Sequence, residues 1–305
     1  MEYLVLCSRA PDNELVAAEC EALTGGKPGS NGLAVSKTFD QVVRAAYLSI
    51  GMRPIAYSKT IAALTEDLRR QSFSADRFRV EFLCLSEQEK THSQDSILAV
   101  ADAIHGAPDL DHPQQRFLLV ASDVGFYFNE ILAESARSYQ KHDAKPYRTS
   151  SSLPSQLARA LVNLTYPARV ILDPCCGTGS IMLEACATGV AAYGMDRNPK
   201  MVGMTRRNLL HFGYEAVVQR GDASRCNQPS EAVVTDLPYG RFLENDEENI
   251  KAILRQMTTL APLGIYIAEK DITSWLQEAG YDKVNVYHLR KRAGLIRFIH
   301  RAQRI

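Results

Sequence analysis

The chain of 305 residues lacks several features that would assign it to a specialised class of protein. It has no run of 18 apolar residues and no N-terminal basic, apolar and small-residue signal, so we expect neither a membrane span nor secretion. Its seven cysteines form no C-x-x-C pair and its seven histidines fall singly, which predicts no metal site. Free thiols in a reducing cytoplasm are the simplest interpretation, and we expect a cytoplasmic protein.

An excess of positive charge is also missing, because 35 basic residues balance 35 acidic ones. Proteins that bind nucleic acid usually present a basic surface, and here basic residues gather only locally. We interpret each basic set, taken alone, as a solvated charged surface. The two sets are Arg69, Arg70, Arg77 and Arg79, and then Lys283, Arg290, Lys291, Arg292, Arg297, Arg301 and Arg304.

A glycine loop at residues 171–184 is the most informative feature that is present. A short apolar run ends in Asp173, a Gly177-Thr178-Gly179 turn follows, and a helix-like stretch begins at Ser180. Glycines at the carboxyl end of a strand let the backbone approach a nucleotide-like ligand. Met182 replaces the third glycine of a dinucleotide fingerprint, and the Lys-Ser/Thr of a P-loop is absent. A glycine loop preceded by Asp-Pro instead indicates a site for S-adenosyl-L-methionine.

A second apolar run, Ala232–Val234, leads into Thr235 and then Asp236-Leu237-Pro238-Tyr239. An exocyclic amine of a base is a poor nucleophile, since its lone pair is delocalised into the ring. The Asp236 carboxylate and the Leu237 carbonyl are two acceptors for its N–H groups. Pro238 brings no competing N–H, and Tyr239 offers a face for stacking, a contact worth about 1–3 kcal/mol. The pattern predicts N-methylation of a base, and it leaves open whether Asp236 takes the proton or only orients the amine.

Two further acids follow the strands that we expect next. Asp196 ends one about 20 residues after the glycine loop, where a carboxylate can accept ribose hydroxyls. Asp222 ends the next, where it can meet the adenine amino group. Either acid alone is more often a helix N-cap. Both together favour a bound nucleoside.

The C-terminal half alternates between strand-like and helix-like patterns of apolar residues. We predict strands near 169–173, 190–196, 215–219, 231–236 and 263–268, with helices near 179–188, 198–212, 247–261 and 270–279. Such alternation is typical of a doubly wound parallel sheet. We expect the runs 283–289 and 294–300 to pair as a hairpin.

The first 145 residues read as short α+β units. We expect strands at Tyr3–Leu6 and Arg77–Leu85, helices at Asn13–Leu23 and Asp95–His105, a strand-to-helix passage from Val35 through Phe39–Leu48, and a hairpin of Arg116–Ala121 with Gly125–Leu132. The polar segment Ser138–Ser152 is the expected linker.

Three passages together resemble the THUMP-containing tRNA guanine-N2 methyltransferases of the guanosine-10 type: residues 145–164, 173–180 and 235–240. The resemblance implies an α/β, Rossmann-like methyltransferase domain with a parallel sheet and an antiparallel last strand, preceded by an α+β ferredoxin-like/THUMP module. The implied domains are 1–65 (ferredoxin-like), 66–137 (THUMP-like, RNA-binding), 138–152 (linker) and 153–305 (methyltransferase).

The resemblance also implies the site. Ser152–Asn163 pack beside the methionine end of the cofactor. The catalytic residues are Asp236, Leu237, Pro238 and Tyr239. The residues around the S-adenosyl-L-methionine are Asp173, Cys175, Gly177, Thr178, Gly179, Ser180, Asp196, Arg197, Asp222, Ala223 and Asp236. Two positions depart from the family: Leu237 replaces a common proline, with activity expected to survive, and Cys175 stands where an aromatic residue is frequent.

The expected activity is methylation of guanosine N2 in tRNA, at position 10. Four alternatives stay open: guanine-N2 methylation of ribosomal RNA, modification at another tRNA position, adenine-N6 or cytosine-N4 methylation of DNA, and a catalytically idle RNA-binding protein. The expected partner is tRNA, and the neutral total charge leaves open an RNA affinity that depends on a small activating subunit.

Overall fold

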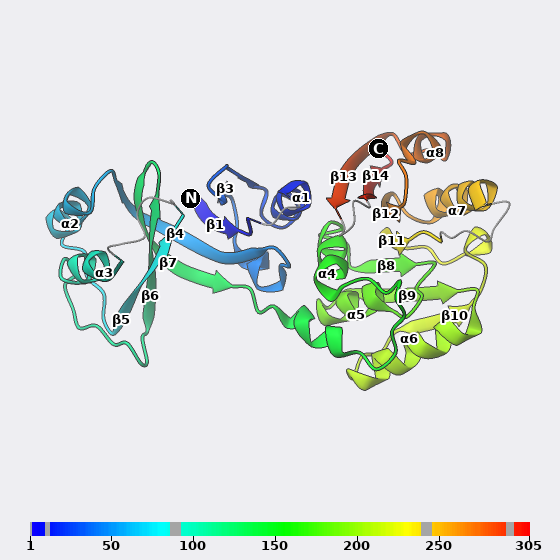
Figure 1. Ribbon diagram of the computed structural model, residues 1–305, viewed down its shortest axis with the longest axis horizontal. Helices are drawn as coiled ribbons and strands as arrows, with labels where there is room; N and C mark the ends of the chain where they lie inside the picture. The colour runs from blue at the N-terminus through cyan, green and yellow to red at the C-terminus, as the bar shows by residue number, and fades with distance from the viewer. Residues whose placement is uncertain (1, 10–12, 86–92, 239–245, 291–295) are drawn as a thin grey trace. The chain divides into compact units, whose positions relative to one another are not determined.

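A computed structural model describes residues 2–9, 13–85, 93–238, 246–290 and 296–305 (Figure 1). The chain forms two compact units, and each is described by itself. The first unit consists of Met1–Arg9, Thr24–Val43 and Leu48–Ser135. The second consists of Ala10–Leu23, Arg44–Tyr47 and Ala136–Ile305. No helix among the described residues is long and apolar enough to cross a membrane.

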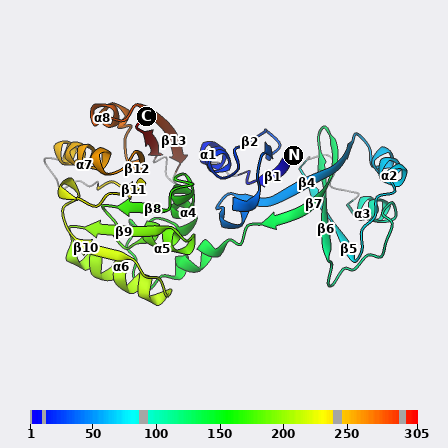
Figure 2. The same cartoon turned by 180° about the vertical axis from the view of Figure 1, so that it is seen from behind.

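One continuous seven-stranded sheet runs through the first unit. Its strands are β1 (Tyr3–Cys7), β2 (Lys27–Pro28), β3 (Leu33–Ser36), β4 (Leu48–Ser58), β5 (Phe78–Cys84), β6 (Gln115–Ser122) and β7 (Gly125–Glu134). They lie in the order β2-β3-β1-β4-β7-β6-β5, and β5 with β6 is the parallel pair. Helices α2 (Ile61–Arg70) and α3 (Ser93–Ala101) lie together beside the β5–β6 end (Figures 1 and 2). Their apolar side chains share a core with Phe78 and Phe117.

Most elements predicted for this half are present, including the antiparallel β6–β7 hairpin. Strand β4 and helix α2 were not predicted. Gly51 and Pro54 interrupt the strand pattern of β4, and the structure accommodates each with a register shift against β7. The predicted passage through Phe39–Leu48 is a 3-10 helix at Asp40–Arg44, followed directly by this long strand.

The second unit contains the mixed sheet that the sequence predicts. Its strands are β8 (Val170–Asp173), β9 (Ala191–Asp196), β10 (Val217–Arg220), β11 (Ala232–Asp236), β12 (Leu263–Ala268), β13 (Lys283–Arg290) and β14 (Ile296–Gln303). The order is β10-β9-β8-β11-β12-β14-β13. Neighbours from β10 to β12 are parallel, whereas β14 is antiparallel to both β12 and β13. The expected antiparallel last strand is therefore confirmed.

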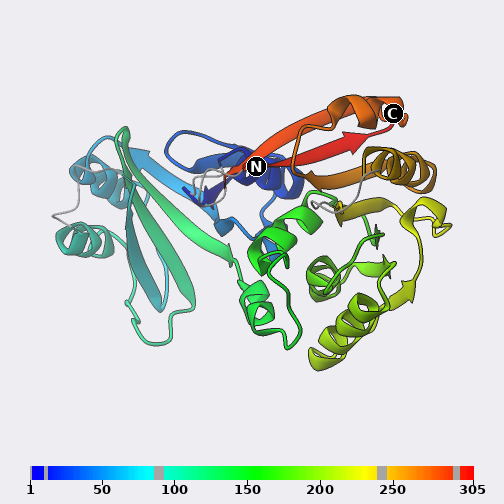
Figure 3. The same cartoon turned by 45° about the vertical axis from the view of Figure 1, so that its right-hand side comes forward.

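Five helices of the second unit accompany this sheet: α4 (Ser155–Asn163), α5 (Ser180–Ala187), α6 (Pro199–His211), α7 (Asp246–Leu260) and α8 (Thr273–Glu278). The last four match the predicted helices within a few residues. Figure 3 shows β13 and β14 side by side, with the C-terminus at the end of β14. The turn predicted between these strands lies outside the described residues.

Two short stretches from the start of the chain belong to the second unit. Helix α1 (Asn13–Thr24) carries Glu19, which is fully buried. The Glu19 carboxylate accepts hydrogen bonds from the backbone N–H groups of Ala46 (2.9 Å) and Tyr47 (2.7 Å) and from Asn163 Nδ2 (2.7 Å). These bonds join α1, residues 44–47 and α4. The functional division of residues 1–137 into two modules stays a prediction.

The segment predicted as a linker, 138–152, is packed into the second unit. It opens with a 3-10 helix at Ser138–Ala144, and both His142 and Lys145 are buried. His142 Nδ1 lies 2.6 Å from Glu184 Oε1 on α5. The segment is thus fixed against the helix that follows the glycine loop.

Candidate functional site

Four acids predicted at the site follow parallel strands at one edge of the sheet. Asp173 ends β8, Asp196 ends β9, Asp222 follows β10 and Asp236 ends β11. Because these strands are parallel, their carboxyl ends meet at this edge, which is where open α/β sheets bind ligands. The sheet topology therefore gathers at one edge four acids that are spread over 64 residues of the sequence.

The glycine loop lies between β8 and α5 and is held by its neighbours. The Cys176 N–H donates to the Met195 carbonyl (2.8 Å), and the Gly177 N–H donates to Asp196 Oδ2 (3.0 Å). Gly177 has φ +53° and Gly179 has φ +83°, a region that favours glycine. A Cβ on Gly179 would lie 2.7 Å from Thr205 Cγ2. The loop thus turns at two residues that carry no side chain.

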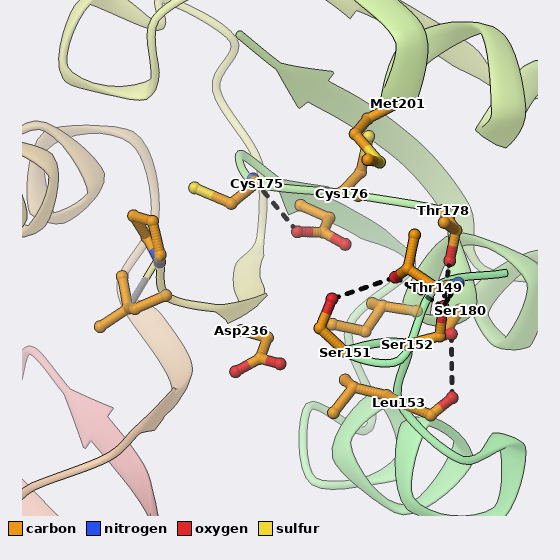
Figure 4. A pocket seen from close by; sticks show the side chains of 15 residues that line it. Thr149, Ser151, Ser152, Leu153, Cys175, Cys176, Thr178, Ser180, Met201 and Asp236 are labelled. Carbon is orange, nitrogen blue, oxygen red and sulfur yellow. Dashed lines mark hydrogen bonds between the residues drawn. The ribbon is translucent and has the colours of Figure 1, made fainter. Parts of the chain in front are cut away.

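An open pocket lies at this loop, with a volume of about 650 Å³ when the open solvent at its mouth is included. In Figure 4 the Asp236 side chain and the Ser151–Leu153 segment border the same space. The pocket brings together eight residues that the sequence predicted: Asp173, Cys175, Gly177, Thr178, Ser180, Asp236, Leu237 and Pro238. Ser152 and Leu153, from the passage expected at the methionine end, also line it. Five lining residues were missed: Thr149, Ser151, Cys176, Ile181 and Met201.

Of the predicted residues that the structure describes, five lie outside the lining set. Gly179 turns the chain into α5, and Asp196 supports the loop through Gly177. Arg197, Asp222 and the buried Ala223 belong to the loops after β9 and β10. Tyr239 lies outside the described residues.

Asp222 and Asp196 both make local bonds of their own. Asp222 is the N-cap of a 3-10 helix, with Oδ1 accepting from the Ser224 N–H (3.0 Å) and hydroxyl (2.8 Å). The hydroxyl bond above all, and then the N–H bond, lowers the Asp222 pKa. Helix α6 is capped by Asn198 rather than by Asp196. Asp196 Oδ1 instead accepts from the Asn198 N–H (2.8 Å).

Asp173 is buried beneath the pocket, with 1% of its surface exposed. Oδ1 accepts hydrogen bonds from the Thr235 hydroxyl (2.9 Å) and the Cys175 N–H (3.3 Å). Burial raises the Asp173 pKa to about 8, against these two bonds and together with the charges of Asp196 and Asp236. A cation bound in the pocket would relieve this clustering of acids. This cluster of acids therefore fits S-adenosyl-L-methionine, which carries a positively charged sulfonium and an ammonium group.

A hydroxyl-rich wall closes the other side of the pocket. Ser152 Oγ lies 2.9 Å from Thr178 Oγ1, and the Ser180 hydroxyl donates to the Leu153 carbonyl (3.0 Å). The buried Lys145 Nζ also donates to Ser180 Oγ, and burial lowers the Lys145 pKa to about 8. Thr149 and Ser151 belong to the 145–164 passage. That passage is therefore the sequence feature that could have identified this side of the pocket.

Leu237 is accommodated as a core residue. Its side chain is 2% exposed and packs with Leu172 and Met195, while its N–H donates to the Ile267 carbonyl (3.0 Å). The leucine side chain thus packs in the core, and residue 237 still offers the backbone carbonyl that a proline would offer there. This explains how leucine stands where the resembled family commonly has proline.

Arg297 was placed by the sequence in a solvated basic cluster, and for this residue the interpretation is wrong. Arg297 is 6% exposed, and its Nη1 lies 3.3 Å from Asp236 Oδ2. The missed signal is an arginine within an apolar strand run, Leu295–Ile299. Arg69, Arg70, Arg77 and Arg79 are exposed, as expected.

Behind the glycine loop, α5 carries a buried ionic network. Arg159 on α4 pairs with Glu184, with Nε and Nη2 lying 2.8 and 2.7 Å from Oε2. His142 contacts the other oxygen of Glu184 and also lies 3.2 Å from the Tyr214 hydroxyl. The seven cysteines are free, and no group of three or more metal-ligating side chains occurs in the part of the chain that the structure describes.

Comparison with known proteins links the second unit to methyltransferases. Residues 142–287 match the family model described as "RMKL-like, methyltransferase domain". A tRNA (guanine(10)-N2)-dimethyltransferase of Pyrococcus abyssi is 32% identical over 173 residues, which cover 53% of this chain and 53% of that protein. One of Methanothermobacter thermautotrophicus is 30% identical over 195 residues, covering 61% and 57%. The chain thus spans less than two thirds of either relative.

The crystal structure of TrmN from Thermus thermophilus is similar to the fold over 100% of both chains, with a TM-score of 0.53 and 19% identity. Together with the sheet order, this similarity confirms the predicted α/β fold, with a parallel sheet and an antiparallel last strand.

Proposed function

We propose that this protein transfers a methyl group from S-adenosyl-L-methionine to the exocyclic N2 of a guanosine in tRNA, at position 10. The observation that carries the proposal is a pocket in which the glycine loop meets Asp236, Leu237 and Pro238. The names of the two tRNA (guanine(10)-N2)-dimethyltransferase relatives support both the reaction and the position.

The cofactor would be held by the loop and by the acids at the strand ends. Asp173 and Gly177 would lie along it, with Asp196 toward the ribose and Asp222 toward the adenine. Thr149 to Leu153 would meet its methionine end. When bound, S-adenosyl-L-methionine supplies an electrophilic methyl group on a sulfonium.

The substrate amine would be held by the motif after β11. The Asp236 carboxylate and the Leu237 carbonyl accept its two N–H groups, which draws the nitrogen lone pair out of conjugation with the ring. That lone pair would form the new N–C bond as the bond from the methyl carbon to the sulfonium sulfur breaks, which leaves a neutral thioether. The nitrogen would then lose one proton to Asp236 or to solvent. Positioning of this kind can contribute about 7–11 kcal/mol to lowering the barrier. Tyr239 stays a predicted stacking residue.

The guanosine would have to be unstacked to enter the pocket, at a cost of a few kcal/mol. Residues 66–137 are proposed to bind the tRNA as a THUMP-like module. A small activating subunit is the proposed source of additional RNA affinity, since the chain carries no net charge. The reaction would take place in the cytoplasm.

Methyl transfer from tritiated cofactor tests the proposal. Bulk tRNA, ribosomal RNA and DNA are offered separately, and each product is digested to nucleosides. Label in N2-methylguanosine or N2,N2-dimethylguanosine from tRNA is expected, and a tRNA transcript with adenosine at position 10 should take up none. Label from ribosomal RNA alone, or in N6-methyladenine or N4-methylcytosine, would identify one of the alternative substrates.

Asp236→Asn should lower turnover at least about 10²-fold while S-adenosylhomocysteine still binds. Glu269→Gln is the matched control, because Glu269 is an exposed acid that follows β12 and does not line the pocket. Absence of labelled nucleoside with all three nucleic acids, from a protein that binds the cofactor, would support the idle RNA-binding alternative.

A further inference from the structure

A buried arginine contacts the acid that the proposed function uses. Arg297 Nη1 lies 3.3 Å from Asp236 Oδ2, and the two side chains are 7% and 17% exposed. Arg297 does not line the pocket, whereas Asp236 does. Arg297 is therefore connected to the pocket through its contact with the Asp236 carboxylate.

The sheet order makes this contact a long-range one. Asp236 pairs with Ile267 on β12, and Ile267 pairs with Ile299 on β14. Two strand spacings, about 10 Å, therefore separate Asp236 from β14. Arg297 lies two residues before Ile299, beyond the carboxyl end of β12, and its long side chain spans this width. Because β14 is antiparallel, its start rather than its end reaches the catalytic edge of the sheet.

Asp236 is largely buried, and its negative charge helps to raise the pKa of Asp173 on β8 and of the Cys175 thiol. Burial disfavours the ionised form of a carboxyl group, whereas a guanidinium within 4–6 Å favours it. The Arg297 guanidinium is a cation in direct contact with Asp236, and its Nη1 donates to Oδ2, which also orients the carboxylate.

We propose that Arg297 is a positioning residue that keeps Asp236 ionised and aimed into the pocket, so that its carboxylate accepts the N–H of a base amine. This inference rests on the proposed function for the identity of that amine. It assigns a role to the antiparallel strand, which brings a cation to the end of β11.

The test compares Arg297→Gln and Arg297→Lys with the wild type. The readout without substrate is the pH titration of the Asp236 carboxyl carbon by ¹³C NMR, assigned by its loss in Asp236→Asn. In Arg297→Gln this titration should move up by about one pH unit or more, and Arg297→Lys should recover part of the difference. The acid limb of kcat/KM for tRNA methylation should move in the same direction, while the affinity for S-adenosylhomocysteine stays unchanged.

Arg301→Gln is the matched control. Arg301 lies four residues further along β14 and donates to the Leu164 carbonyl (3.4 Å), so this variant removes the same charge from the same strand at a distance from Asp236. Its carboxyl titration and pH profile should coincide with those of the wild type. Thermal unfolding of each variant reports whether it is folded.

An unchanged Asp236 titration in folded Arg297→Gln would overturn the inference, as would an equal shift in Arg301→Gln. If Arg297→Gln does not fold, Arg297→Lys decides through the same titration, because a mobile ammonium should hold the carboxylate less well than the guanidinium. A wild type that methylates no guanosine would overturn the proposed function instead. The ¹³C titration would still decide the role of Arg297.

Discussion

The Thr235 hydroxyl donates a 2.9 Å hydrogen bond to the Asp173 carboxylate, and this bond joins the ends of two neighbouring parallel strands. Both residues are buried, at 0% and 1% exposure. Asp173 begins the loop at the proposed cofactor site, and Thr235 immediately precedes Asp236. The two halves of the site are thereby held together by one buried bond.

Thr235→Val should destabilise the protein by about 1–3 kcal/mol, because it removes this donor from a buried acceptor without changing side-chain shape. Chemical denaturation measures the change. Thr259→Val is the control, since the exposed Thr259 hydroxyl donates only to the Gln256 carbonyl of its own helix. Equal losses in the two variants would contradict a special role for the bond to Asp173.

Asp173 should make stability fall as pH rises. Its folded pKa is raised to about 8 from 3.8. Between these values the folded state holds a proton that the unfolded state has released, so the free energy of unfolding decreases with pH. Asp173→Asn lacks this dependence. Its free energy of unfolding, relative to that of the wild type, should therefore rise by up to about 3 kcal/mol between pH 6 and pH 8.5. Urea unfolding at the two pH values measures the gain, and a constant difference between the proteins would contradict it.

Gly179→Ala should be more damaging than Gly189→Ala. Both glycines have positive φ, +83° and +74°, so each alanine pays about 1–2 kcal/mol of backbone strain. At Gly189 nothing lies within 4 Å of an added Cβ, whereas at Gly179 the Thr205 side chain is 2.7 Å away. Thr205 cannot turn aside without losing its 2.7 Å bond to the Gly177 carbonyl. Calorimetric binding of S-adenosylhomocysteine should be lost in Gly179→Ala and kept in Gly189→Ala.

Glu184→Gln should cost about 3–5 kcal/mol of stability, because it leaves the buried Arg159 guanidinium without its carboxylate. The control is Glu278→Gln. Glu278 is 64% exposed and lies 3.8 Å from Lys251, and such a surface pair contributes no more than about 1 kcal/mol. Guanidinium unfolding of the two variants gives the comparison. A loss below about 1 kcal/mol in Glu184→Gln would show that the network does not stabilise the fold.

Lys145 should make stability rise with pH above neutrality. Burial lowers its folded pKa to about 8 from 10.5, so between these values the unfolded state binds a proton that the folded state does not. The free energy of unfolding of the wild type, relative to that of Lys145→Met, should therefore rise by on the order of 3 kcal/mol between pH 8 and pH 10.5. The difference in unfolding free energy between the two proteins isolates this group, and a difference independent of pH would refute the assignment.

Much of the second unit was predictable because its signals are local. Each parallel strand is a short apolar run that ends in an acid, and Gly177 and Gly179 mark a turn that other residues rarely adopt. The Asp236-Leu237-Pro238 motif follows β11 as predicted, and the pocket brings it to the glycine loop. In the first unit β4 was missed, since Gly51 and Pro54 mimic loop residues until the register shifts against β7 absorb them.

The sequence by itself determined which residues stand at the strand ends, because strand length and turn chemistry are properties of neighbouring residues. Tertiary structure alone decided which distant residues complete the site. Arg297 reaches Asp236 only because β14 enters the sheet between β12 and β13 in the reverse direction. Thr149 and Ser151 join the pocket only because Lys145 and His142 are buried against α5. The free energy of burying such polar groups depends on partners far along the chain, which no local pattern records.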